Sequence, residues 1–134
     1  MTIKHYVKFD LSATSARKVV PLSLGDENVH KIIFSIANGS EPVDISSSMN
    51  YAAVAVKNGA NDGAGVVDTA TVNDDYNTVE WIPGADALSV SGNVLSYLTV
   101  FNGEGKKLYS PSFYLFVRDN CSEALEEAPI AAPA

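Results

Sequence analysis

Hydrophobic residues recur along this chain in short runs, and no window of useful length shows the period of a helix. The runs are rich in Val, Ile, Tyr and Phe, and stretches of Gly, Asn, Asp and Ser separate them. This pattern is typical of a β-sandwich or β-barrel, so we predict an all-β domain of roughly nine short strands in two sheets. The expected strands cover Lys4–Leu11, Lys18–Leu24, Val29–Ala37, Val43–Ile45, Tyr51–Lys57, Val66–Val72, Thr78–Ile82, Asn93–Phe101 and Lys107–Val117.

One segment, Pro83–Val90, is predicted to form a short helical turn. Pro83 can begin the turn, the side chain of Asp86 can cap it, and Leu88 can anchor it to the core. Trp81, which precedes it, is the only tryptophan and is expected to be buried against the opposite sheet. Helix should therefore be confined to about one turn near Asp86.

The last predicted strand, in GEGKKLYSPSFYLFVRD, has apolar residues on both of its faces. By alternation, Phe113, Leu115 and Val117 should fill the core, and Tyr114 and Phe116 should point the other way. A strand with water on one face should carry polar residues there. Tyr114 and Phe116 are therefore the candidate interface, an aromatic pair that anchors a partner protein.

The turn Asn102–Gly105 joins the last two predicted strands, and Asn-Gly between two apolar runs favours a hairpin. Beyond Arg118 the composition shifts to Ser, Glu, Ala and Pro, with too little apolar surface to fold onto a domain. We predict a β-sandwich domain over residues 1–118 and a disordered tail or linker stub over residues 119–134.

Charge and hydropathy narrow the range of partners. The 134 residues carry a net charge of −7, and the nine basic residues are scattered, so we expect no nucleic-acid partner. No apolar run approaches the roughly 20 residues of a membrane span, so we expect no membrane insertion. The N-terminal stretch lacks the continuous apolar core of a signal peptide. Cys121 is the only cysteine, so no intrachain disulfide can form.

Catalytic motifs are absent from the sequence. The two histidines, His5 and His30, lie far apart along the chain, and no nucleophile elbow, phosphate loop, dinucleotide fingerprint or Cys/His metal spacing occurs. We therefore expect no enzyme and no cofactor. Loop carboxylates are the only candidate metal ligands, but they lack the ordered spacing of a calcium loop, so we expect solvated turn carboxylates and no metal site. These carboxylates are Asp62, Asp68, Asp74 and Asp75.

Three stretches, within roughly Tyr6 to Arg118, have a familiar order of elements. The first is LGDENVHKIIFSIANGSEPVDIS, the second is YAAVAV, and the third is TVEWIPGADALSVSGNVLSYLTVFNGEGKKLYSPSFYLFV. In these stretches the chain resembles the N-terminal domain of phage baseplate upper proteins, found in tailed phages and prophages of Gram-positive bacteria. The features shared in the first stretch are Gly25-Asp26, the strand Ile32–Ile36, the turn Asn38-Gly39 and the ending Pro42–Ile45.

The resemblance implies an immunoglobulin-like antiparallel β-sandwich in the virion, at the baseplate of the phage tail. Its role would be to attach to the tail hub and to position host-recognition proteins. Its partners would be other baseplate or tail proteins or further copies of itself, and it would be made in the cytoplasm of the bacterial host. Tyr114 and Phe116 would then cover a neighbouring subunit or an N-terminal strand.

Two other readings of the sequence belong to different classes. The first is a carbohydrate-binding β-sandwich module, because exposed aromatic rings can stack on sugar rings, and Tyr76, Tyr97 and Tyr109 are the candidates. The second is a domain of a bacterial surface adhesin, which the missing signal peptide disfavours. Glycan binding that is abolished by a single Tyr→Ala substitution would favour the carbohydrate-binding module.

Overall fold

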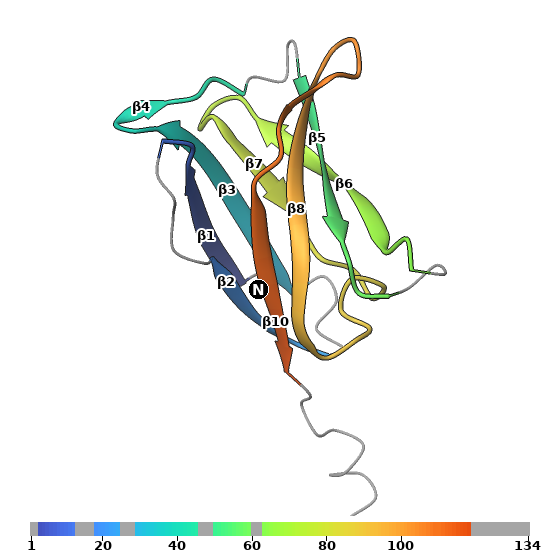
Figure 1. Ribbon diagram of the computed structural model, residues 1–134. Helices are drawn as coiled ribbons and strands as arrows, with labels where there is room; N and C mark the ends of the chain where they lie inside the picture. Colours follow the sequence, from blue (N-terminus) through green and yellow to red (C-terminus); the bar gives the residue numbers. More distant parts are fainter. Residues whose placement is uncertain (1–2, 13–17, 25–28, 46–49, 60–62, 119–134) are drawn as a thin grey trace, which may run out of the picture.

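The computed structural model describes residues 3–12, 18–24, 29–45, 50–59 and 63–118. Within these residues the chain forms ten β-strands and no helix, which confirms the all-β prediction (Figure 1). No helix of the described part is therefore long and apolar enough to cross a membrane. The strands are β1 (Ile3–Asp10), β2 (Val19–Ser23), β3 (His30–Asn38), β4 (Glu41–Pro42), β5 (Asn50–Val56), β6 (Val66–Asn73), β7 (Thr78–Trp81), β8 (Gly92–Asn102), β9 (Lys107–Tyr109) and β10 (Ser112–Arg118).

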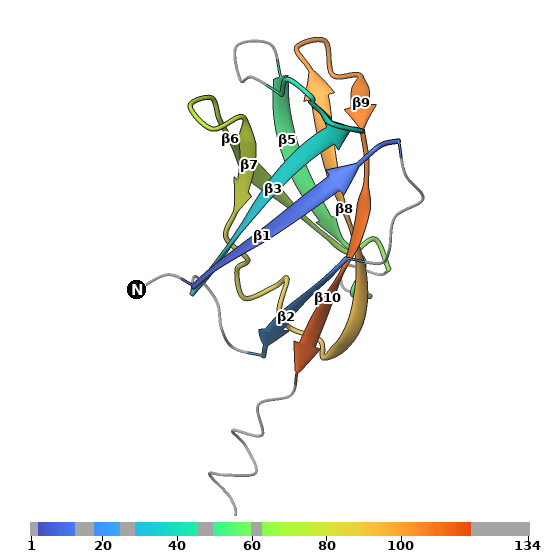
Figure 2. The same ribbon diagram turned by 90° about the vertical axis from the view of Figure 1, so that its left-hand side faces the viewer.

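The strands form one continuous sheet with the order β1-β3-β7-β6-β5-β8-β10-β2, and β4 and β9 pair with β3 and β8 beside this path. The sheet curls so that β1, β3 and β7 face β5, β8 and β10 (Figures 1 and 2). β6 belongs to both halves, because its part Val66–Ala70 pairs with β5 and its part Thr71–Asn73 pairs with β7. The predicted pair of sheets is therefore a single, nearly closed, barrel-like sheet.

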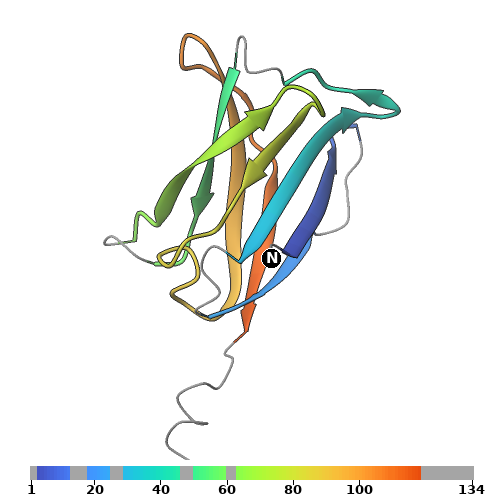
Figure 3. The same cartoon turned by 180° about the vertical axis from the view of Figure 1, so that it is seen from behind.

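The prediction of a wholly antiparallel arrangement is wrong for two strand pairs. β1 runs parallel to β3, and β2 runs parallel to β10. The chain passes from β1 in one half to β2 in the other and then returns to β3 (Figure 3). Because neither β1 nor β2 pairs with a strand adjacent to it in sequence, neither is joined to its partner by a tight hairpin, and parallel pairing becomes accessible. β1 and β2 lie at the two ends of the strand order.

A cluster of aromatic rings holds the two halves of the sheet together. The ring of Phe113 in β10 lies 5.1 Å from that of Phe34 in β3 and 6.5 Å from that of Trp81 in β7. Phe9 in β1 stacks on Phe34 at 5.9 Å. The predicted burial of Trp81 is confirmed, and its indole Nε1 donates a hydrogen bond of 3.0 Å to Asp68 Oδ2. Each such buried ring contributes about 1.5–3 kcal/mol by removing apolar surface from water.

The segment that was expected to be helical forms a turn. The amide of Leu88 donates to the carbonyl of Ala85 at 3.2 Å, and the side chain of Leu88 is buried as predicted. The carbonyl of Asp86 is taken by two side chains, since Asn58 Nδ2 and Ser89 Oγ both donate to it. A carbonyl occupied in this way does not carry a helical ladder, so the segment stops after one hydrogen-bonded turn.

Two strand predictions are wrong in detail. Val43–Ile45 is not a strand: the amide of Val43 donates to Ile36 O, and the amide of Ile45 donates to the side chain of Asn77. The predicted last strand is divided into β9 and β10, with Ser110 and Pro111 between them. Pro111 has no amide hydrogen and cannot continue a ladder as a donor, which accounts for the break.

Candidate functional site

The outer side of β2, β5, β6, β8 and β10 carries a broad surface without charge, called here the outer apolar face. Strand pairing aligns its side chains in rows: Tyr114 lies between Val19 and Leu95, and Phe116 lies between Pro21 and Asn93. A third row joins Tyr97 to Ala55, which pairs in turn with Val67. The face comprises Val19, Pro21, Ala53, Ala55, Val67, Leu95, Tyr97, Tyr114 and Phe116.

The structure separates the two sides of β10 as the alternation predicts. Phe113, Leu115 and Val117 are buried, and Leu115 is 0% exposed. Phe116 is 39% exposed, whereas Tyr114 is half-buried among its neighbours. No described strand covers these two rings from outside. β2 pairs with β10 edge to edge, so the N-terminal segment extends the sheet instead of lying over it.

The charges near this face lie at its margin. Lys57 directly follows β5, Lys18 precedes β2, and Arg118 ends β10. At the far end of the face, Tyr51 stacks on Phe101 with their ring centres 5.1 Å apart. An apolar centre with a polar rim is the usual anatomy of a protein interface. The geometry therefore suits contact with a protein surface and offers no arrangement of acid, base or nucleophile.

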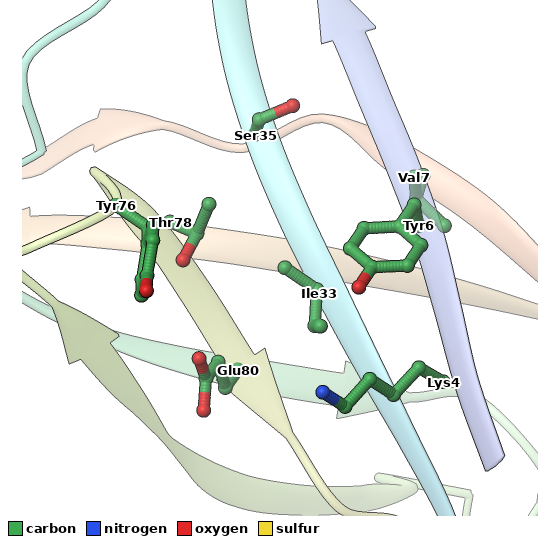
Figure 4. Close-up of a pocket in the computed structure, with 8 residues that line it drawn as sticks. All are labelled: Lys4, Tyr6, Val7, Ile33, Ser35, Tyr76, Thr78 and Glu80. Atoms are coloured by element: carbon green, nitrogen blue, oxygen red, sulfur yellow. The ribbon is translucent and has the colours of Figure 1, made fainter.

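A groove of about 510 Å³ lies on the other side of the molecule, over β1, β3 and β7 (Figure 4). Tyr6 and Tyr76 flank it, and Ile33 lies between them (Figure 4). Both tyrosines are largely in solvent, at 74% and 76% exposed. A smaller hollow of about 270 Å³ shares Glu80 with the groove. The remaining residues that line the groove are Lys4, Val7, Ser35, Thr78 and Glu80.

Hydrogen bonds hold the carboxylate of Glu80 in place. Asn73 Nδ2 donates to Oε2 at 2.9 Å, and Lys31 Nζ lies 3.1 Å from Oε1. The hydrogen bond from Asn73 and the nearby ammonium of Lys31 lower the pKa of Glu80 below its ordinary 4.5, against a smaller opposing effect of burial. Glu80 is therefore ionised at neutral pH and presents acceptor oxygens at the groove.

The two histidines, separated in sequence, lie next to each other in the structure. His5 Nε2 and His30 Nδ1 are 2.9 Å apart, and the ring centres are 5.0 Å apart. The cause is the register of the parallel pair, which aligns Ile3 with His30 and His5 with Ile32. Burial, followed by repulsion from His30, lowers the pKa of His5 below its ordinary 6.5.

The candidate sugar-stacking tyrosines are not brought together. Tyr76 stands at the groove, Tyr97 is half-buried within the outer apolar face, and Tyr109 packs against the core from β9. Sequence reasoning missed Tyr6, which faces Tyr76 across the groove. The sequence does contain a signal for the exposure of Tyr6. Strict alternation places Lys4, Tyr6 and Lys8 on the side of β1 opposite to the core residues Val7 and Phe9.

The loop carboxylates also lie apart. Asp68 is the acceptor for Trp81, which makes it a structural group rather than a solvated turn residue, whereas Asp74 and Asp75 are exposed at the β6–β7 turn. Asp62 lies outside the described residues. In the described part of the chain, no group of three or more His, Cys, Asp or Glu side chains is close enough to hold a metal ion.

Comparison with known proteins identifies the fold. No protein-family model matches the sequence, and no curated protein matches it. Among solved structures, the chain is similar to the N-terminal domain of phage TP901-1 ORF48, with a TM-score of 0.67 and 15% sequence identity. The match covers 88% of this chain and 100% of that one. The resemblance predicted from the sequence is thus confirmed at the level of fold, as a likeness to the N-terminal domain of a phage protein.

Proposed function

We propose that this protein is a structural component of a phage tail baseplate, which attaches to the tail hub and positions host-recognition proteins. One observation carries the proposal: the fold matches that of the N-terminal domain of phage TP901-1 ORF48, a baseplate component, over the whole of that domain. The chain would reside in the virion tail after synthesis in the cytoplasm of the host. The proposal also includes the fold type that the resemblance implies, an immunoglobulin-like β-sandwich.

The outer apolar face supports a role in assembly. Isolated apolar side chains are common on protein surfaces, but a large contiguous apolar patch usually marks a contact site. We place the contact with another baseplate or tail protein here, with Tyr114 and Phe116 at its centre and the charges of Lys18 and Arg118 at its rim. A second copy of the chain is the other partner that this face could accept. The proposed role is carried by surface shape and needs no catalytic group.

The test is the location of the protein in assembled particles. Virions produced from the genome that encodes the chain would be purified, and gold-labelled antibodies against residues 1–118 would be imaged by electron microscopy. We expect label at the tail tip and not on the capsid or along the tail tube. Absence of the protein from purified particles, or label confined to capsids, would contradict the proposal.

A further inference from the structure

We propose that the groove between Tyr6 and Tyr76 is a binding site for a neutral oligosaccharide. This site lies on the outer side of β1, β3 and β7, and the outer apolar face lies across the core on β2, β5, β6, β8 and β10. The inference goes beyond the proposed function, because a baseplate protein does not need a sugar site in order to be assembled.

The two tyrosines have the exposure that stacking requires. They are the most exposed large apolar side chains of the described residues, and neither packs against another ring. Figure 4 shows the ring of Tyr6 face-on and that of Tyr76 edge-on, with Ile33 between them. One ring therefore lies along the sheet as a platform, and the other stands up as a wall. The apolar C–H face of a pyranose can stack on such a ring while its hydroxyls reach polar groups beside it.

Hydroxyl groups line the upper part of the groove in Figure 4. Ser35 comes from β3 and Thr78 from β7, and both lie above Ile33 in this view (Figure 4). Thr78 Oγ1 is a buried polar atom without a hydrogen-bond partner within the described chain. Buried polar groups normally have partners, so an unsatisfied hydroxyl in the wall of a groove points to a bound ligand or water.

Glu80 and Lys4 supply an acceptor and a donor at the opposite end of the groove (Figure 4). Glu80 is fixed by Asn73 and Lys31 and is ionised, so it accepts hydrogen bonds from sugar hydroxyls without first rearranging. The lining of the groove itself carries one cation, Lys4, and one anion, Glu80, which favours a neutral ligand. The smaller hollow beyond Glu80, lined also by Lys31, Thr69, Thr71 and Ile82, gives room for a second sugar unit.

The donor and acceptor pattern favours a saccharide over a proline-rich peptide, the other ligand that binds between exposed tyrosines. Proline lacks an amide hydrogen, so such a peptide offers few donors to the Glu80 carboxylate and to the hydroxyls of Ser35 and Thr78. A sugar carries donors and acceptors around its whole ring. The volume of about 510 Å³ also falls within the range of about 300–1,000 Å³ that is typical of small-ligand sites.

The experiment uses the full chain on an array of immobilised bacterial cell-wall and storage oligosaccharides, neutral and acidic, followed by calorimetric titration of each glycan bound. We expect binding of at least one neutral oligosaccharide, and both Tyr6→Ala and Tyr76→Ala should weaken it about tenfold, the loss of roughly one stacking contact. Glu80→Gln should weaken it as well. Tyr51→Ala is the matched control, since Tyr51 is an exposed tyrosine far from the groove. This variant should bind the oligosaccharide with unchanged affinity.

Three results would overturn the proposal. They are no binding to any glycan on the array, binding to acidic glycans alone, and binding that survives both tyrosine substitutions in the groove. Binding of a proline-rich peptide that depends on Tyr6 and Tyr76 would assign the groove to another class of ligand. None of these results bears on the location of the protein in virions, so the two proposals can fail separately.

Discussion

At the scale of single residues, Leu115 and Phe116 are adjacent in β10 and have opposite surroundings: one is 0% exposed and the other 39% exposed. Leu115→Asp would bury a carboxylate in the core, so we expect it to destabilise the domain by about 4 kcal/mol or more and to abolish a cooperative melting transition. Phe116→Asp should leave the melting temperature nearly unchanged. It should weaken docking or self-association by about 2 kcal/mol or more, the scale of a buried aromatic anchor.

Melting curves and light scattering on the two variants test this prediction together. If both variants unfold, Phe116 contributes to the fold itself and the contact surface must be sought elsewhere. If Phe116→Asp folds and associates like the unsubstituted protein, the outer apolar face is not the docking surface.

The pair of His5 and His30 predicts a dependence of stability on pH. The pKa of His5 is lower in the folded protein than its ordinary 6.5, so the unfolded chain takes up the proton first as the pH falls. Above pH 6.5, His5 is neutral in both the folded and the unfolded protein, and the stability is fully retained. It should fall as the pH drops below 6.5 towards the lower pKa of the folded protein.

Urea titrations at about pH 7.5 and about pH 5.5 measure this slope, and His5→Asn is the control variant. The loss of stability between these two values should be smaller in His5→Asn. The pKa values of the Asp10 and Glu80 carboxylates are also lowered in the folded protein. These groups change the stability only at pH values below their ordinary pKa values of 3.8 and 4.5, so they do not contribute in the range that is measured. An unchanged slope in the variant would show that His5 is not the group responsible.

At the scale of elements, the side chain of Asn77 fastens the β6–β7 turn to the segment after β4. Its Oδ1 accepts from the amide of Ile45 at 2.9 Å, and its Nδ2 donates to the carbonyl of Val43 at 2.8 Å. Asn77 also has a positive φ of 54°, which glycine adopts freely and alanine does not.

Asn77→Gly should therefore destabilise the protein by about 1–3 kcal/mol through the loss of the two hydrogen bonds. Asn77→Ala should destabilise the protein by roughly 1 kcal/mol more than Asn77→Gly, because alanine adds backbone strain at this positive φ. Chemical denaturation of the unsubstituted protein and of the two variants gives the order of their stabilities directly. Equal stability of Asn77→Gly and the unsubstituted protein would mean that the turn is not fastened through this side chain.

Most elements could be predicted from the sequence because alternation of apolar and polar residues is a local signal. The faces of β3 and β10 follow from it, and the turn at Asn102 follows from the equally local Asn-Gly signal. The pairing of β1 with β3 and of β2 with β10 does not, because a local pattern carries no information about which distant strand lies alongside. The groove and the histidine pair were missed for the same reason: His5 and His30 meet through the pairing of β1 with β3, and Tyr6 and Tyr76 need the pairing of β3 with β7 as well.

At the scale of the whole molecule, the described core ends with β10. Residues 119–134, predicted from composition to be a disordered tail, lie outside the described residues. Deletion of Ser122–Ala134 should leave the melting temperature unchanged, because this segment has too little apolar surface to repay its ordering entropy. Limited proteolysis should also trim the chain to a stable fragment that ends near Arg118. A marked drop in melting temperature after the deletion would show that the segment packs on the domain.

The parallel pairing of β2 with β10 also has a consequence for the timing of assembly. Val19–Ser23 is made early on the ribosome, but its partner Ser112–Arg118 is the last strand of the domain to be made, so this edge of the sheet stays open until synthesis of the domain is complete. The outer apolar face takes Val19 and Pro21 from the first strand of this pair and Tyr114 and Phe116 from the other. A partner that binds across both strands recognises only chains that have finished folding. In the proposed baseplate role, such a partner would therefore exclude incomplete copies of the chain from assembly.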